Sequence, residues 1–175
     1  MFAVIVCLAV ILCLPVCLRA ANPASAGDNA IHVTADRLLT DTQTQTAEFI
    51  GSVRVVRGDM TIVSDRLKVL YADSGDRNKE AKPGVESIRR IVAEGNVKIT
   101  VKEMLATTDR AEWSPGEQTI VLTGKGSRIV SGKNTITGSK ITLHQADNRI
   151  RVEGDDDERV EAQFFSGEKG LSFDQ

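Results

Sequence analysis

The chain has 175 residues, of which 41% are hydrophobic and only 4% aromatic, and its formal net charge is -2. A nucleic-acid-binding surface needs a basic face and stacking rings, so this composition argues against DNA or RNA as a partner. The three cysteines, Cys7, Cys13 and Cys17, all lie near the N-terminus. The rest of the chain therefore cannot use disulfides and must rely on its core and its backbone hydrogen bonds.

The N-terminal segment has the pattern of a secretory signal. Residues 2–18 are almost wholly apolar, and the small residues that follow end in Ala24-Ser25-Ala26, an A-x-A cleavage sequence. We therefore expect cleavage after Ala26. The alternative is a retained membrane anchor, because no Lys or Arg precedes Arg19, although Pro15 interrupts a segment already short for a transmembrane helix.

The remaining residues are enough for one domain. A chain of about 150 residues buries roughly 70% of the surface that it exposes when unfolded, and nothing in the sequence marks a second domain. We predict a signal peptide at residues 1–26, one domain at residues 27–165 and a C-terminal tail at residues 166–175.

Apolar residues alternate with polar ones through nearly all of this domain, which is the period of a strand with one buried face. Turn sequences such as Arg57-Gly58-Asp59 and Ser131-Gly132-Lys133-Asn134 separate the alternating runs, and a long charged loop extends from Asp73 to Gly84. We expect an antiparallel sandwich or roll with no convincing helix. In chain order, the alternating sets are Ile31/Val33/Ala35, Val53/Val55, Met60/Ile62, Leu67/Val69/Tyr71, Val97/Ile99/Val101, Ile120/Leu122, Ile141/Leu143 and Ile150/Val152.

One motif occurs four times along the domain: a polar residue and a cation open a strand-like run that closes on a glycine. Three copies have the same length, and the second is longer because it contains the charged loop. A chain built from one repeated β unit forms an elongated stack, not a globule around a catalytic cleft. The copies are Asp36-Arg37 to Gly51, Asp65-Arg66 to Gly95, Asp109-Arg110 to Gly124, and Ser139-Lys140 to Gly154.

The parity of the apolar residues changes just before each polar-cation pair. Even-numbered Met60 and Ile62 are followed by odd-numbered Leu67 and Val69. Such a shift exchanges the two faces of a strand unless a bulge or bend intervenes. We therefore predict a corner at each motif, where the chain passes from one sheet to a facing one, and glycines such as Gly51 that allow a further bend. The predicted product is a twisted, open roll with an apolar lumen.

These segments resemble the OstA-like repeat of the LptA family of lipopolysaccharide-transport proteins. The similarity is carried by residues 31–36, by the closing segments at 49–53, 93–97 and 121–124, and by residues 138–143. It extends from Ile31 to about Phe165. The resemblance implies an all-β, twisted, open β-jellyroll of antiparallel strands in a periplasmic protein that binds lipopolysaccharide and bridges the inner and outer membranes.

The resemblance also implies partners: lipopolysaccharide, like protomers joined head to tail, and related β-jellyroll domains of LptC-like inner-membrane and LptD-like outer-membrane components. No cofactor or metal is implied. Two alternatives remain, an LptC-like component that is anchored in the inner membrane and a non-catalytic carbohydrate-binding β module. Exposing an acyl chain of about twelve methylenes to water costs on the order of 10 kcal/mol, so a carrier has to cover the chain.

By the match to the family's N-terminal strand, Ile31 and Val33 are expected to contact acyl chains, and Ile99 and Trp113 are carried over in the same way. Alternatively, the inward aliphatic residues are ordinary core, and Trp113 plugs one end of the roll. The other candidate acyl contacts are Phe49, Val53, Val55, Ile62, Leu67, Val69, Leu122, Ile141 and Leu143.

The cations of the four motifs are expected on the outer face, where they either meet lipid phosphates or maintain solubility at strand corners. The run Asp155-Asp156-Asp157-Glu158 is interpreted as a solvated turn because its carboxylates are consecutive, unlike those of a calcium loop. No nucleophile elbow or phosphate loop is found, so we expect no enzyme and no catalytic residue. The four cations are Arg37, Arg66, Arg110 and Lys140.

Overall fold

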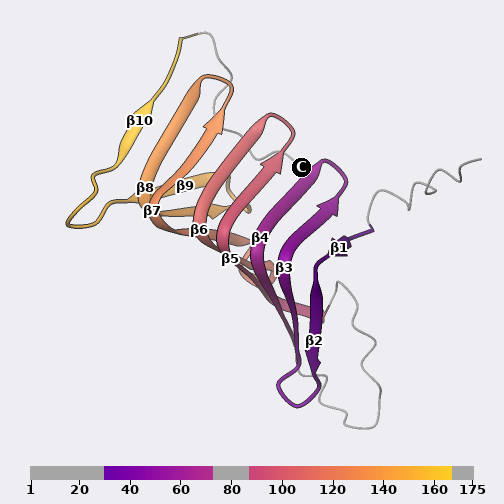
Figure 1. Ribbon diagram of the computed structural model, residues 1–175. Coiled ribbons are helices and arrows are strands. Elements are labelled where there is room, and N and C mark those ends of the chain that lie inside the picture. The colour runs from indigo at the N-terminus through magenta and orange to yellow at the C-terminus, as the bar shows by residue number, and fades with distance from the viewer. Residues whose placement is uncertain (1–29, 73–86, 167–175) are drawn as a thin grey trace, which may run out of the picture.

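The computed structural model describes residues 30–72 and 87–166, which form an antiparallel sheet of ten strands (Figure 1). A short 3-10 helix spans Pro115–Glu117. The predicted signal peptide, the charged loop and the C-terminal tail lie outside the described residues. The strands are β1 (His32–Thr34), β2 (Arg37–Asp41), β3 (Thr46–Arg57), β4 (Met60–Tyr71), β5 (Ile88–Val101), β6 (Met104–Ser114), β7 (Thr119–Ser131), β8 (Asn134–His144), β9 (Arg149–Glu153) and β10 (Glu161–Gln163).

The six long strands, β3 to β8, form a meander in which each strand pairs with its neighbour in sequence. At the N-terminal edge, β1 pairs with one half of β3 and β2 pairs with the other half. At the C-terminal edge, β9 and β10 divide β8 between them in the same way. Each edge is therefore one strand that is broken in the middle.

Every long strand bends near its centre, and the bends lie side by side in the sheet (Figure 1). The register shifts between Ile50 and Val53, where Gly51 and Ser52 stand opposite Asp65 alone. Two residues against one is the definition of a β-bulge, which bends and twists a strand. The predicted corners are thus confirmed, with one difference: hydrogen bonding continues past the bends, so the two facing walls belong to one sheet.

We call the half of the sheet that contains residues 46–50 of β3 the first wall, and the half that contains residues 53–57 the second wall. The motif explains the boundary between them, because its aspartate lies over the glycine that closes it. A Cβ atom at Gly51, Gly95 or Gly124 would collide with the side chain of Asp36, Asp65 or Asp109 respectively. The backbone there also has positive φ, 82° at Gly51 and 78° at Gly95, which favours glycine.

Small hydroxyl side chains satisfy backbone groups at these bends. The Ser64 hydroxyl donates to the carbonyl of Arg66 at 3.0 Å. Thr108 and Ser127 share a hydrogen bond of 2.8 Å between their hydroxyls, and Ser127 also donates to the carbonyl of Gly124 at 2.8 Å. A bulge leaves backbone carbonyls without ladder partners, so these buried hydroxyls are part of the corner.

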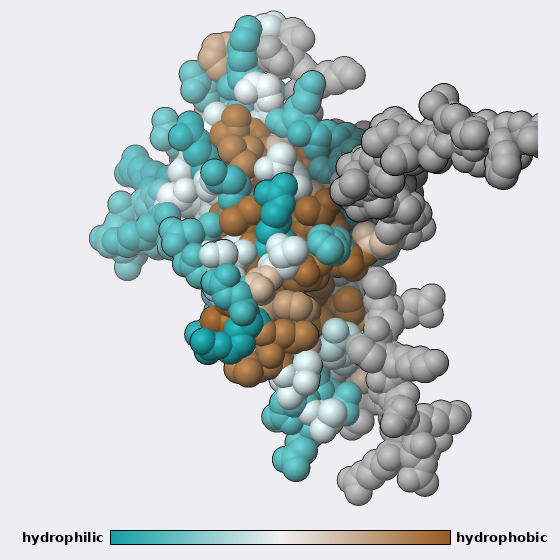
Figure 2. All heavy atoms as spheres, turned by 45° about the vertical axis from the view of Figure 1, so that its right-hand side comes forward, coloured by the Kyte–Doolittle hydropathy of each residue, from teal (hydrophilic) through white to brown (hydrophobic). Residues whose placement is uncertain are grey.

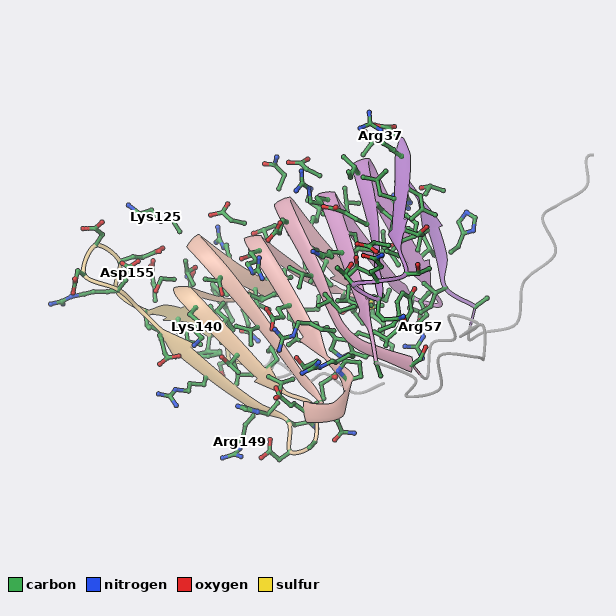
Figure 3. All side chains as sticks on the ribbon, turned by 90° about the horizontal axis from the view of Figure 1, so that it is seen from below. Arg37, Arg57, Lys125, Lys140, Arg149 and Asp155 are labelled. Carbon is green, nitrogen blue, oxygen red and sulfur yellow. The ribbon has the colours of Figure 1, made fainter. Side chains whose placement is uncertain are left out.

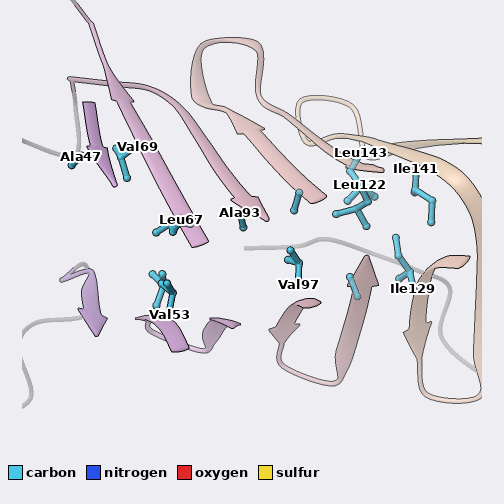
Figure 4. Close-up of a cluster of buried hydrophobic side chains, with 13 residues drawn as sticks. Ala47, Val53, Leu67, Val69, Ala93, Val97, Leu122, Ile129, Ile141 and Leu143 are labelled. Atoms are coloured by element: carbon cyan, nitrogen blue, oxygen red, sulfur yellow. The ribbon is translucent and has the colours of Figure 1, made fainter. Parts of the chain in front are cut away.

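The core lies between the two walls. Figure 4 shows Leu67 and Leu122 of the first wall facing Val53, Val97 and Ile129 of the second. Leu122, Ile129 and Ile141 are fully buried. Within residues 30–72 and 87–166, no helix has the length and hydropathy that a membrane crossing requires.

Candidate functional site

An apolar cavity of about 320 Å³ lies between the walls in the N-terminal half of the sheet. Figure 2, which brings the N-terminal strands forward, shows hydrophobic residues gathered in one patch with hydrophilic residues to the left of it. The lining residues are Ile31, Val33, Phe49, Val55, Arg57, Met60, Ile62, Leu67, Val69, Tyr71, Ile88, Ile91, Ala93, Ile99, Ala111, Glu112, Trp113, Ile120 and Gln145.

Nine of the thirteen residues predicted to contact acyl chains line this cavity. They come from strands far apart in the sequence, and the two walls bring them together around one space. The nine are Ile31, Val33, Phe49, Val55, Ile62, Leu67, Val69, Ile99 and Trp113. The sequence had grouped them only as inward-facing residues.

The other four predicted contacts lie in the packed core, outside the lining of the cavity. Val53, Leu122 and Ile141 have no exposed surface, and Leu143 is 5% exposed. All four belong to the hydrophobic core cluster: Val53 comes from β3, Leu122 from β7, and Ile141 and Leu143 from β8. The cavity is thus lined mainly from the N-terminal half of the sheet, whereas Leu122, Ile141 and Leu143 are buried in its C-terminal half.

Several lining residues were absent from the prediction. Met60, Tyr71 and Ile120 belong to alternating sets that the sequence showed, so their parity was a usable signal. Arg57 continues the alternation of Val53 and Val55, although the sequence placed it in the turn Arg57-Gly58-Asp59. The remaining additions are Ile88, Ile91, Ala93, Ala111, Glu112 and Gln145.

The polar groups at the cavity differ in how they are satisfied. Burial raises the pKa of the Tyr71 hydroxyl above its ordinary value, because the phenolate is poorly solvated there. Glu112 is held by two cations, with Arg90 Nε at 3.2 Å and an Arg110 guanidinium nitrogen at 3.4 Å. Arg57 is half-buried, and no described carboxylate forms an ion pair with it.

The motif cations lie on the outer face, as predicted, and three of them pair with carboxylates on neighbouring strands. Arg66 lies 3.3 Å from Glu48, and Lys140 lies 3.8 Å from Glu153. Arg110 pairs with Glu94. All three cations are at least 45% exposed, so each pair contributes little to stability, about 0–1 kcal/mol.

The acidic run after β9 forms a turn. Asp155 accepts hydrogen bonds from the backbone N–H groups of Asp157 and Glu158, at 3.0 and 2.8 Å. Glu158 in turn accepts from the N–H of Gly126 at 2.9 Å. In the part of the chain that the structure describes, no three potential metal ligands come together.

Comparisons with known proteins agree with this architecture. An uncharacterized protein of Rhizobium meliloti (strain 1021) is 28% identical over 118 residues, which are 67% of this chain and 62% of that protein. The chain thus spans less than two thirds of that relative. The crystal structure of LptH, the LptA-homologous periplasmic component of the lipopolysaccharide transport device of Pseudomonas aeruginosa, matches with a TM-score of 0.62. The match has 15% identity and covers 78% of this chain and 96% of LptH, so it shows a shared fold.

The family model described as LptA/(LptD N-terminal domain) LPS transport protein matches residues 32–149. This span begins at β1 and reaches the first residue of β9, so it includes both walls of the cavity. The chain therefore belongs to the LptA/LptD N-terminal domain family of lipopolysaccharide-transport proteins, with the all-β roll that its repeats predicted.

Proposed function

We propose that this protein carries lipopolysaccharide between the inner and outer membranes, with the acyl chains shielded between its two walls. The observation that carries the proposal is the apolar cavity, whose lining is mostly aliphatic, with three aromatic residues, Phe49, Tyr71 and Trp113. Aliphatic walls without a deep shape-specific pocket suit flexible chains that have to slide. Covering about twelve methylenes offsets on the order of 10 kcal/mol of unfavourable hydration.

The nine cavity residues predicted from the sequence are the proposed acyl contacts. Val53, Leu122, Ile141 and Leu143 would join them only if the walls separate where these residues pack, because all four are buried. The cavity alone accommodates part of a lipid. Passage along the whole roll therefore requires the C-terminal half to open.

The proposed location is the periplasm, after cleavage of residues 1–26, with residues 27–165 as the transport domain and residues 166–175 as a tail. The apolar N-terminal segment and the description of LptH as a periplasmic component support it. A mature chain that begins at Gly27 on N-terminal sequencing would separate this form from a membrane-anchored one.

The proposed protein partners are like protomers, joined head to tail, and LptC-like and LptD-like domains at the two membranes. Both edges of the described sheet support this, because β1 and β2 at one edge and β9 and β10 at the other have a strand neighbour on one side only. Unpaired strand edges recruit further strands. Joining two rolls edge to edge would place their walls in line.

Photo-crosslinking at two adjacent residues of β5 tests the function. A photoreactive residue at Ile99 faces the cavity, whereas one at Lys98 is on the exposed face of the same strand. In cells that make lipopolysaccharide, we expect lipid adducts at position 99 and none at position 98. Equal labelling, or none at either position, would contradict a lipid-shielding cavity and favour the carbohydrate-binding module.

A further inference from the structure

We propose that Arg57 binds the anionic group, a phosphate or carboxylate, at the end of an alkyl chain that lies in the cavity. The inference rests on the proposed function and adds a polar contact that determines where the ligand binds. Apolar walls alone do not determine how deep an alkyl chain lies in the cavity. A contact with Arg57 would place the charged end of the ligand at the margin of the cavity, beside the turn that joins β3 to β4.

The backbone directs Arg57 toward the cavity. It is the last residue of β3 and follows Val53 and Val55 on the same face of the strand, where both of these are buried. Gly58, with φ of 52°, then turns the chain into β4. Figure 3 shows Arg57 among the purple N-terminal strands, away from Lys125 and Lys140 at the other end.

Arg57 differs from other cations of the roll in what it faces. Of the described residues that line the cavity, it is the one with a cationic side chain, and no described carboxylate forms an ion pair with it. The acidic lining residue, Glu112, is already held by Arg90 and Arg110. A half-buried guanidinium beside apolar walls is poorly solvated, so an incoming anion gains more there than at an exposed site.

The chemistry of the guanidinium selects the ligand class. Its planar fork of N–H donors matches the oxygens of phosphate and carboxylate groups in a bidentate arrangement. The apolar cavity next to it selects an alkyl chain. An anion-terminated alkyl chain fits both the guanidinium and the cavity. A neutral alkyl chain fits only the cavity, and free phosphate fits only the guanidinium.

The test measures binding to the purified protein through the fluorescence of Trp113, which lines the same cavity and is the one tryptophan of the chain. The probes are decyl phosphate, decanol and inorganic phosphate. We expect decyl phosphate to bind at least tenfold more tightly than decanol, which corresponds to about 1.4 kcal/mol. Inorganic phosphate at equal concentration should displace neither probe.

Arg57→Gln should remove most of the preference for decyl phosphate and leave the affinity for decanol unchanged. Arg54→Gln is the matched control, because Arg54 lies on the exposed face of the same strand, and it should retain the preference. If Arg57→Gln fails to fold, the salt dependence of the wild-type protein replaces it: added sodium chloride should weaken decyl phosphate binding and leave decanol binding unchanged.

The two proposals fail in different ways. If wild-type protein binds the two decyl probes equally, or if Arg54→Gln loses the preference as Arg57→Gln does, the role of Arg57 is wrong while the apolar cavity stands. If inorganic phosphate displaces decyl phosphate, the site binds free phosphate and the proposed alkyl ligand is wrong. If neither decyl probe binds, the cavity is not a lipid site and the proposed function itself fails.

Discussion

At the scale of single residues, the corners depend on one recurring contact between an aspartate and a glycine. The sequence showed this pair in three of the four motifs, Ser139 replacing the aspartate in the fourth, but it could not show why the pair recurs. The reason is tertiary: the aspartate of one strand lies over the glycine of the next, and the glycine has a positive φ. At Gly95 the contact is supported further, because the Asn96 side chain donates a hydrogen bond of 2.8 Å to Asp65.

Gly95→Ala should destabilise the fold by about 1–3 kcal/mol, because the new methyl group meets Asp65 and the backbone φ is unfavourable for alanine. Urea denaturation measures the change. Gly116→Ala is the control, since no atom lies within 4 Å of the added Cβ, and it should have little effect. Adding Asp65→Ala to the Gly95 variant should restore only the part of the loss that is steric. Equal stability of the two glycine variants would contradict the packing explanation.

At the scale of strands, the alternation predicted which residues face inward, and the change of parity predicted where each strand bends. Neither pattern predicted that hydrogen bonding continues around the corner, because that depends on how many residues each bulge inserts. Neither pattern could distinguish the inward residues that line the cavity from those that form the packed core. Ile99 and Leu122 both belong to alternating runs, but Ile99 lines the cavity whereas Leu122 is fully buried.

That division predicts different costs for the same kind of truncation. Leu122→Ala removes side-chain atoms from close packing and should cost about 2–5 kcal/mol of unfolding free energy. Ile99→Ala enlarges a space that already exists, so its cost should be clearly smaller. Both are measured by chemical denaturation of the purified variants. Equal losses would mean that the two positions are packed alike and that the cavity is not open in solution.

At the scale of the whole molecule, the repeats predicted an elongated roll with two free ends, and the described sheet has two such edges. Both edges expose large apolar side chains: Leu38 (53%) and Leu39 (49%) in β2 at the N-terminal edge, and Val160 (46%), Phe164 (64%) and Phe165 (44%) near β10 at the C-terminal edge. The alternating pattern did not predict the exposure of Phe164 and Phe165, because they follow the last alternating run. The proposed docking end remains the C-terminal strand, as expected from the open ends of the roll.

Deleting all residues after Val160 removes β10 and should weaken head-to-tail assembly, because the next protomer loses the strand to which it would pair. Light scattering over a range of protein concentrations measures the effect. A chain that ends at Phe165 keeps β10 and serves as the control; it should assemble like the full-length protein. If the shorter chain is folded by circular dichroism and assembles unchanged, the C-terminal edge is not where protomers join.

The Asp-Gly corner has a consequence for how such a roll can vary in size. Each hairpin brings its own bend, so the bend of the roll is determined within a repeat and the length of the roll by the number of repeats. Each added strand extends the sheet by about 4.8 Å. A gene that gains or loses one repeat would thus yield a longer or shorter roll with the same bend, so the length of this architecture can change independently of its curvature.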